Sequence, residues 1–444
     1  SIVIAMSIGL VACSQAPNNG PAPASSASAP AASSTTAAAQ AQASNPFFTA
    51  STLPYQAPPF DKIKDTDYQP AIEEGMKQQL AEVDKIANNP DVPTFDNTYV
   101  ALEKSGQLLT RVMAVFNGVT AANTDDALQK VQEDEAPKLA AHQDAITLND
   151  KLFQRIQAVY DQRDSLKLDP ESMRLIEVVH RNFVMGGAKL SDADKAKLKD
   201  LNKEESTLEA QFNNKLLAAA KDGALVIDDK SKLAGLSDED IAAAAQAAKD
   251  RKLDGKWVLT LQNTTQQPLL QDLTDRPTRQ ALFEASWNRA EKGNADDTRD
   301  IIERLAQLRA QKAQLLGFPN YAAWTLQDQM AQTPDNVMNF MNKLAPAAVA
   351  RAKIEAADIQ KQIDKDQAAL HQPTFKLEPW DWEHYAEEVR KAKYDLDDSQ
   401  IRPYFELNNV LQNGVFYAAN QLYGLTFKER KDIPVYNPDV RVFE

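Results

Sequence analysis

Apolar residues recur every three or four positions along almost the whole chain from Pro46 onward. This spacing places them on one face of an α-helix, so each such segment predicts an amphipathic helix, and we expect helices to dominate from about Asp67. The apolar positions expected to share a face are Leu198, Leu201, Leu208, Phe212 and Leu216 in residues 191–223; Ile302, Leu305, Leu308 and Leu315 in 299–316; and Leu407, Val410, Leu411, Ala418 and Leu422 in 406–423.

Polar residues and prolines mark where several of these helices begin. Ser191 and Ser237 each precede a helical pattern and are followed three residues later by Asp, an arrangement like a capping box. The pair Thr333-Pro334 places a capping hydroxyl before a proline at the first helical position, where proline is favoured. We therefore expect helices to start at these three points.

Glycine and proline also predict where helices end. Gly317 and Gly424 each follow the last apolar position of a helical pattern, and glycine is the usual residue just after a helix. Pro346 lies inside the helix that should start at Thr333-Pro334. Because proline lacks a backbone N–H and its ring crowds the preceding turn, a kink or a break is expected there.

Strand patterns are few. Residues 224–227 and 257–261 are short apolar runs that could pair as a small ribbon. The predicted fold class is therefore all-α with minor, short β-structure.

Composition argues against two classes of function. The 444 residues include only 14 Gly, whereas a nucleotide-binding α/β protein needs glycine at its phosphate-binding turns. The formal net charge is −14 and no run of Lys and Arg stands out. Nucleic-acid binding requires a concentrated basic surface, so no nucleic-acid partner is expected.

The amino-terminal segment has the properties of an export signal. Residues 2–12 form an apolar run that is too short to span a bilayer and fits the core of a signal peptide. Its end, Leu10-Val11-Ala12-Cys13, resembles the lipobox of bacterial lipoproteins, in which the Cys is lipidated. Cys13 is the single Cys, so no internal disulfide is expected. The alternative is a cleaved secretory peptide with an incidental Cys.

The residues after Cys13 predict a flexible tether. Residues 14–45 contain no charged and no aromatic side chain, so they cannot bury enough apolar surface to fold. Treated as a random coil, a tether of this length spans roughly 30 Å. A lipid-anchored protein on the periplasmic side of a bacterial envelope is the location expected from these features.

The residues that could carry chemistry form no complete site. None of the four histidines lies four residues from another, so no helix face offers two imidazoles to one metal. His384 has Glu387 and Glu388 one helical turn further on, and we interpret these three residues as part of a solvated surface. We interpret His180 as a packed or capping side chain. No nucleophile elbow or Walker A loop occurs, and residues 185–189 resemble a phosphate loop only superficially. The histidines are His142, His180, His371 and His384. The tryptophans interpreted as core or cleft-wall residues are Trp324, Trp380 and Trp382.

Several motifs taken together resemble the thimet-oligopeptidase-like zinc peptidases. The motif from residue 257 to residue 270 is more similar to the peptidyl-dipeptidase Dcp branch than to the oligopeptidase A branch. The resemblance covers residues 45–444. The other segments that carry it are 93–98, 152–153, 309–318, 321–324, 329–331, 379–381 with Tyr385, 402–407 and 422–425.

This resemblance implies a helical clam of two lobes around a deep channel that admits short or unfolded peptides. In the Dcp branch, dipeptides are removed from free carboxyl termini. The family binds one zinc ion through an H-E-x-x-H helix and a later Glu. No H-E-x-x-H occurs between Ser1 and Glu444, so no catalytic or metal-ligating residue is assigned in this chain. Because the chain begins with Ser and ends on an apolar run, we expect both natural ends to be missing, with the catalytic part beyond Glu444.

The predicted organisation has four parts: a lipoprotein signal peptide (1–13), a disordered tether (14–45), an amino-terminal helical region (46–270), and a helical region that leads into the zinc domain (271–444). The predicted function is the front portion of a zinc-dependent peptidyl-dipeptidase. Two alternatives stay open: an oligopeptidase A-like endopeptidase, and a helical envelope lipoprotein without enzymatic activity. The expected partners are peptides and, through the anchor, a membrane, with no protein partner inferred.

Overall fold

The computed structural model describes residues 45–394 and 398–444. Within them the chain is mainly helical, and the strands are limited to two short antiparallel pairs, which confirms the all-α class with minor β-structure. The predicted signal peptide with Cys13 and the predicted tether, apart from Asn45, lie outside the described residues.

The elements follow one another in chain order with short connections. The α-helices are α2 (Asp65–Ala87), α3 (Ala101–Glu103), α4 (Gln107–Ala122), α5 (Asp126–Thr147), α6 (Asp150–Asp161), α7 (Pro170–Met185), α8 (Asp192–Asp222), α9 (Asp238–Asp250), α10 (Asn263–Asp272), α11 (Arg276–Trp287), α12 (Arg299–Leu315), α13 (Tyr321–Thr325), α14 (Pro334–Ala369), α15 (Trp382–Tyr394), α16 (Asp398–Ile401), α17 (Leu407–Asn409) and α18 (Tyr417–Tyr423). The strands are β1 (Leu225–Ile227), β2 (Trp257–Leu259), β3 (Glu429–Arg430) and β4 (Val442–Phe443). Among the short 3-10 and π segments, η3 (Phe95–Val100), η7 (Pro379–Asp381) and η9 (Val410–Phe416) are used below.

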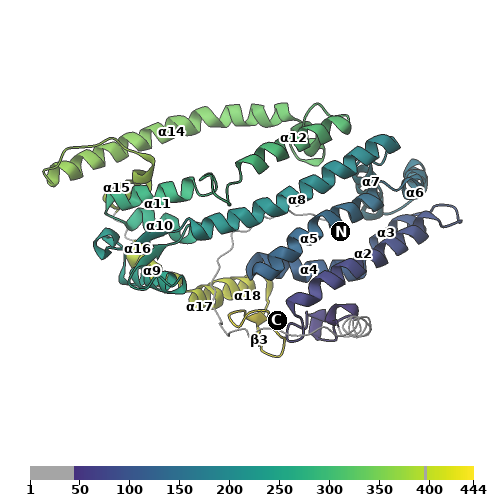
Figure 1. Ribbon diagram of the computed structural model, residues 1–444, viewed down its shortest axis with the longest axis horizontal. Coiled ribbons are helices and arrows are strands. Elements are labelled where there is room, and N and C mark those ends of the chain that lie inside the picture. Colours follow the sequence, from purple (N-terminus) through teal and green to yellow (C-terminus); the bar gives the residue numbers. More distant parts are fainter. Residues whose placement is uncertain (1–44, 395–397) are drawn as a thin grey trace, which may run out of the picture.

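The long helix α8 runs through the middle of the body in Figure 1, with α5 beside it and with α2 and α4 beyond α5. Helices α9, α10, α11 and α15 gather at one end of α8. Helix α14 extends along the upper edge of the view, and α17 and α18 lie at the lower edge. The β1–β2 ribbon pairs Leu225 with Leu259 and Val226 with Val258, as the two apolar runs predicted.

The buried apolar side chains form several clusters along the body rather than one continuous core. One joins α2, α4 and α5, a second joins α2 to α6 and α7, a third joins the β1–β2 ribbon to α9, α10 and α11, and a fourth joins α14 to α15. Representative fully or nearly fully buried members are Ile72, Ile156, Leu273 and Ile363. Each cluster stabilises its own group of helices through removal of apolar surface from water.

The predicted helix starts and stops are confirmed at atomic detail. The side-chain oxygens of Ser191, Ser237 and Thr333 accept the backbone N–H three residues on, at 3.2, 3.1 and 3.2 Å. Helices α12 and α18 end before Gly317 and Gly424, whose φ angles are +84° and +69°. This left-handed conformation costs glycine little, which explains the residue type at both ends.

One prediction about a helix interior is wrong. Ile302 was expected on the packed face of α12 but is 52% exposed, and Ile301 takes the buried position. The buried face of α12 is therefore shifted from the predicted one at this position, although Leu305 and Leu308 are buried as predicted. Of the kink or break expected at Pro346, the break does not occur, because α14 continues through this residue; the kink stays a prediction. Residues 338–354 are all exposed, so water can reach the carbonyl group that loses its helical partner at Pro346.

Two histidines are part of the packed body. His142 Nε2 donates to Gln79 Oε1 (2.7 Å), and His180 Nε2 donates to Gln157 Oε1 (2.9 Å). The His180 ring also stacks on Tyr160 with centroids 3.7 Å apart, which confirms the prediction that His180 is packed.

A buried carboxylate joins α11 to the start of α15. Asp381, in η7, is fully buried and accepts a bidentate pair of hydrogen bonds from Arg276, the shortest at 2.8 Å. Arg279, one turn further along α11 and 1% exposed, donates to Asp381 Oδ1 at 3.2 Å, the same oxygen that Arg276 Nε contacts at 3.0 Å. The Arg276 guanidinium also lies 4.0 Å from the centre of the Phe375 ring. We call Asp381, Arg276 and Arg279 the Asp381 cluster.

Replacement of Asp381 by Asn should destabilise the protein strongly. The variant keeps the shape of the side chain but leaves two guanidinium groups without their counter-charge, one of them buried. Breaking such a buried ion pair costs about 3–5 kcal/mol of unfolding free energy. Urea unfolding followed by helical circular dichroism measures the change. The control is Glu355→Gln, which breaks the exposed Arg351–Glu355 pair on α14 and should leave the unfolding midpoint unchanged. Equal midpoints for both variants would contradict a structural role for the Asp381 cluster.

Stability should also fall as the pH drops below about 6.5. Burial lowers the pKa of His142, His180 and His384 in the folded protein. The unfolded chain therefore binds more protons between pH 6.5 and the folded pKa values, and each group contributes a slope of at most about 1.4 kcal/mol per pH unit. The measurement is the unfolding free energy between pH 7.5 and 5. His180→Phe, which keeps the ring stack, should flatten this slope; an unchanged slope would show that His180 does not contribute.

Candidate functional site

The most prominent charged cluster of the motif regions lies between α8 and α12. Glu205, which is 8% exposed, accepts hydrogen bonds from Arg309 (2.9 Å) and Lys312 (2.9 Å). Arg309 also donates to Glu209, one turn further along α8, at 2.7 Å. Four charges of alternating sign are thus held within one helix–helix contact, which we call the Glu205 cluster.

The surroundings keep Glu205 ionised. Burial by itself would raise the pKa of this carboxyl, but the charges and hydrogen bonds of Lys312 and Arg309 outweigh the burial and leave the pKa below its ordinary value. A carboxylate that is ionised and paired on both oxygens holds no proton to donate. Glu205 therefore suits the attachment of α12 to α8 and does not suit general acid catalysis.

Two aromatic rings complete this cluster. Arg309 Cζ lies 5.3 Å from the centre of the Tyr321 ring, and Lys312 Nζ lies 5.3 Å from that of Trp324. Trp324 Nε1 donates to the carbonyl oxygen of Met185, the last residue of α7, at 3.2 Å. The motif residues of 309–324 thus connect α7, α8, α12 and α13, in agreement with the packing role expected for Trp324.

The segment that superficially resembles a phosphate loop is the end of helix α7. Ala188 N donates to the carbonyl oxygen of Phe183 at 2.9 Å, and Gly187 has a φ of +96°. A Cβ at Gly187 would lie 2.6 Å from a methyl carbon of Leu198. The glycine is therefore required by close packing against α8 and by the turn.

The interpretation of His384 as part of a solvated surface is wrong. His384 is partly buried, and its Nδ1 donates to the carbonyl oxygen of Gln271 in α10 at 2.8 Å. Burial is the main cause that lowers the pKa of His384. Glu387 is buried and accepts hydrogen bonds from Arg390 at 2.6 and 2.8 Å. Helix α15 packs against α10 through this face, which the charged sequence around His384 did not predict.

No group of three His, Cys, Asp or Glu side chains within residues 45–394 and 398–444 is arranged to hold a metal ion. His142 and His180 have protein partners, as described above, and His371 lies on the surface after α14. The statement that the catalytic and zinc-binding residues are absent from the whole chain stays a prediction.

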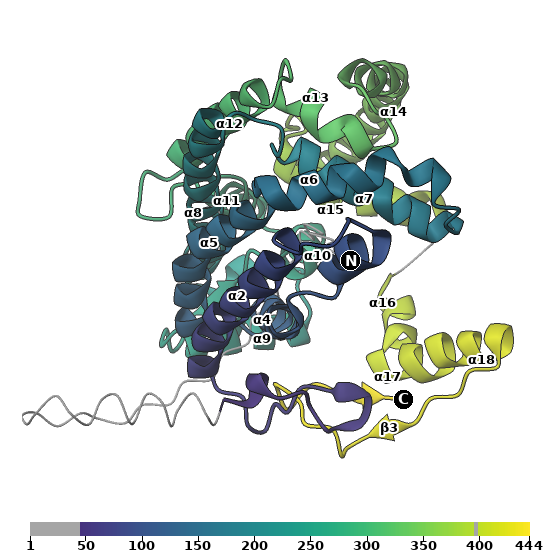
Figure 2. The same cartoon turned by 90° about the vertical axis from the view of Figure 1, so that its right-hand side faces the viewer.

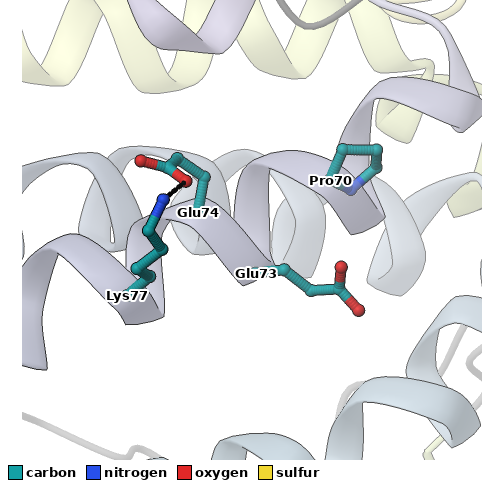
Figure 3. Close-up of a pocket in the computed structure, with 4 residues that line it drawn as sticks. All are labelled: Pro70, Glu73, Glu74 and Lys77. Atoms are coloured by element: carbon teal, nitrogen blue, oxygen red, sulfur yellow. Dashed lines mark hydrogen bonds and ion pairs between the residues drawn. The ribbon is translucent and has the colours of Figure 1, made fainter. Parts of the chain in front are cut away.

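A hollow on the surface of α2 is lined by Pro70, Glu73, Glu74 and Lys77. Figure 3 shows Glu74 and Lys77 turned toward each other, with the Glu73 carboxylate pointing away from them. Lys77 Nζ is 3.0 Å from a Glu74 carboxylate oxygen. All four lining residues belong to one helix, so the hollow is not formed by side chains that converge from separate elements. This hollow lacks the features of an active site.

Sequence reasoning missed the buried ion pairs. The Asp381 cluster has partners about 100 residues apart, as does the Glu205 cluster. Sequence reasoning also missed Arg155 of α6, a buried guanidinium whose partners are neutral: it donates to the carbonyl oxygens of Asn89 and Asp91 and to Asn97 Oδ1. The usable signal was Arg at positions 276 and 279 on one helix face, together with an Asp inside the 379–381 motif.

Among the described residues, no helix is both long enough and apolar enough to cross a membrane.

Comparison with known proteins agrees with the motifs. Residues 269–444 match Peptidase family M3. The chain is 56% identical over 400 residues to dipeptidyl carboxypeptidase of Escherichia coli K12 and 53% identical over 402 residues to that of Salmonella typhimurium. Oligopeptidase A of Escherichia coli K12 is 27% identical over 405 residues. Each match covers 90% of this chain and 58% of the relative, so the chain spans somewhat more than half of their length.

The two kinds of comparison agree with each other and with the segments that carry the resemblance. The identity to both dipeptidyl carboxypeptidases is about twice the identity to oligopeptidase A over similar residues. By these matches, residues 269–444 are similar to Peptidase family M3, and the chain is more similar to the dipeptidyl carboxypeptidases than to oligopeptidase A.

Proposed function

We propose that this chain is part of a zinc-dependent peptidyl-dipeptidase that releases dipeptides from the carboxyl termini of short peptides. The observation that carries the proposal is the identity of 56% to a dipeptidyl carboxypeptidase, against 27% to an oligopeptidase A. Because the chain spans 58% of these relatives, the proposal concerns the whole protein to which these residues belong.

The zinc ion would be held outside the described residues. These residues contain no three-ligand cluster, and the 444-residue sequence contains no H-E-x-x-H. We place the zinc ligands in the part of the family's polypeptide that these residues do not include. When bound, zinc polarises a peptide carbonyl and makes water more acidic, which is the chemistry that hydrolysis requires.

The described residues would form the wall against which the peptide is positioned. The Glu205 and Asp381 clusters fix α8, α11, α12 and α15 relative to their neighbours, and both are buried ion pairs with defined geometry. A rigid wall limits the conformations that a bound peptide can adopt, which favours positioning of its scissile bond. A two-lobed body with a deep channel, as proposed from the resemblance, would exclude folded proteins from this wall.

We also propose that the protein is anchored to a bacterial envelope membrane on its periplasmic side. The support is the apolar run before Cys13, the lipobox-like end Leu10-Val11-Ala12-Cys13, and the uncharged residues 14–45 that follow. A lipid on Cys13 with a tether after it would hold the helical body clear of the membrane surface.

The full-length protein should release dipeptides only from peptides with a free carboxyl terminus. Mass spectrometry of an amino-terminally blocked octapeptide should show successive loss of carboxyl-terminal dipeptides. The same peptide with an amidated carboxyl terminus is the matched control and should be cleaved much more slowly. A zinc chelator should stop the reaction, and added zinc should restore it. Internal cuts at equal rates in both peptides would favour the oligopeptidase A-like alternative, and no cleavage of either would favour a lipoprotein without enzymatic activity.

Replacement of Cys13 by Ser should prevent lipid attachment, because the acyl chains are carried by the thiol. In a bacterial host fed with labelled palmitate, the unchanged full-length protein should be labelled and should sediment with membranes. The Cys13→Ser protein should be unlabelled, whereas the neighbouring control Ser14→Ala should behave like the unchanged protein. Label retained on Cys13→Ser would refute the proposed anchor.

A further inference from the structure

The first half of α14 has the composition of a buried helix but lies in the open. Residues 338–350 contain one charged side chain, Lys343, whereas charged residues make up 25% of the chain. A helix that is apolar or small nearly all round is normally buried on more than one side. All residues from 338 to 354 are nevertheless exposed in this body.

The exposed side chains of this half are large and apolar. Met338, Phe340, Leu344 and Ile354 are 56%, 64%, 53% and 56% exposed. The second half of the same helix is packed against α15, where Ile359 and Ile363 are 2% and 0% exposed. One half of α14 is thus held by an apolar cluster, while the other extends beyond it without a covering element in the described body.

A second segment repeats this pattern. Residues 407–427, which include α17, η9 and α18, contain no charged side chain. Leu407, Leu422 and Tyr423 are 74%, 73% and 75% exposed. The predicted apolar face of residues 406–423 is therefore present in the sequence but is not buried in this body. The segment is ordered internally, since Phe416 stacks on Phe427 with ring centroids 4.2 Å apart.

The two segments lie toward one side of the body in Figure 2 but at its upper and lower edges in Figure 1, so they are two separate apolar surfaces. In Figure 2 both are on the right-hand side of the body, with α14 above and α18 below. We call the first half of α14 (residues 338–354) and residues 407–427 together the α14/α18 face. Extensive exposed apolar surfaces are rare on monomeric soluble proteins and mark sites that another surface covers.

We infer that the α14/α18 face is the internal interface on which the remaining part of the family M3 polypeptide packs, the part that carries the proposed zinc site. The inference rests on the proposed function for the identity of this occupant. Both segments lie within residues 269–444, which match the family. The matches cover 58% of the relatives, so about two fifths of a relative's length remain to cover them.

A covalently continuous occupant fits the geometry better than a second copy of the chain. The two segments belong to separate elements at different heights on one side, and a body of that length can reach both at once. The nearly uncharged composition also favours a permanent interface, because transient surfaces retain more charged and polar residues. The face would thus be formed once, during folding, and would hold the proposed zinc site against the helical wall.

The test is hydroxyl-radical footprinting of the full-length protein, read out by peptide mass spectrometry. In the full-length protein, Phe340, Leu344 and Tyr423 should be protected from labelling, to the same degree as the buried reference Ile363. Trp287, which is 76% exposed at the end of α11, should be labelled strongly as the exposed reference. Labelling of Phe340 and Tyr423 at the rate expected for exposed side chains would overturn the inference.

Two controls distinguish the proposed occupant from the other surfaces that could cover this face. The first control is dilution, with light scattering used to follow the molecular mass, and the labelling pattern should not change. Protection that disappears as a dimer dissociates would assign the face to a second copy and would overturn the inference. In the full-length protein, Phe340→Asp combined with Leu344→Asp should restore labelling of Met338 and Met341. Leu370→Asp, at an exposed position beyond the uncharged stretch of α14, should not.

Labelling requires neither zinc nor peptidase activity, so the outcome is independent of catalysis. Protection of the face in a protein that cleaves no peptide would support the interface and count against the proposed function. An active peptidase with a labelled face would support the function and overturn the interface.

Discussion

The pairing of buried carboxylates with arginine and lysine from distant helices is the interaction on which this body depends. Asp381 and Glu205 are each removed from water and each faces two cationic side chains. A buried charge is stable only when its partners are placed accurately, so these contacts tolerate little movement. They therefore fix relative helix positions more sharply than apolar contacts, which have no direction.

The location of the ion pairs explains why they matter. The apolar clusters are separate, and the Asp381 cluster joins α11, from the cluster around the β1–β2 ribbon, to α15, from the cluster with α14. The Glu205 cluster likewise joins α12 to the central helix α8. Apolar burial stabilises each group of helices, and the ion pairs set how one group lies against the next. The arrangement of these helices is thus an electrostatic property as much as a hydrophobic one.

Local interactions were predictable from the sequence, and distant ones were not. The caps at Ser191 and Thr333 depend on residues within one turn, so their sequence signals were sufficient. The burial of His384 depends on the Gln271 carbonyl, 113 residues away, and nothing near His384 indicates that contact. Ile302 shows the same limit on a smaller scale, because the packed face of α12 is set by the position of α8. The zinc peptidase resemblance came from motif order, not from any assembled site.

The motifs that carry the family resemblance divide into two physical kinds. Arg309, Lys312 and Asp381 are used inside the described body, where they form ion pairs between helices. Leu407 and Tyr423 belong to motifs of the same family but are largely exposed, and they lie in a segment without charge. Selection for solubility alone would place charged residues there. An exposed apolar motif beside buried ionic motifs therefore shows that the segments carrying the resemblance differ in their surroundings: some are enclosed by this body, and others leave apolar surface uncovered within the described residues.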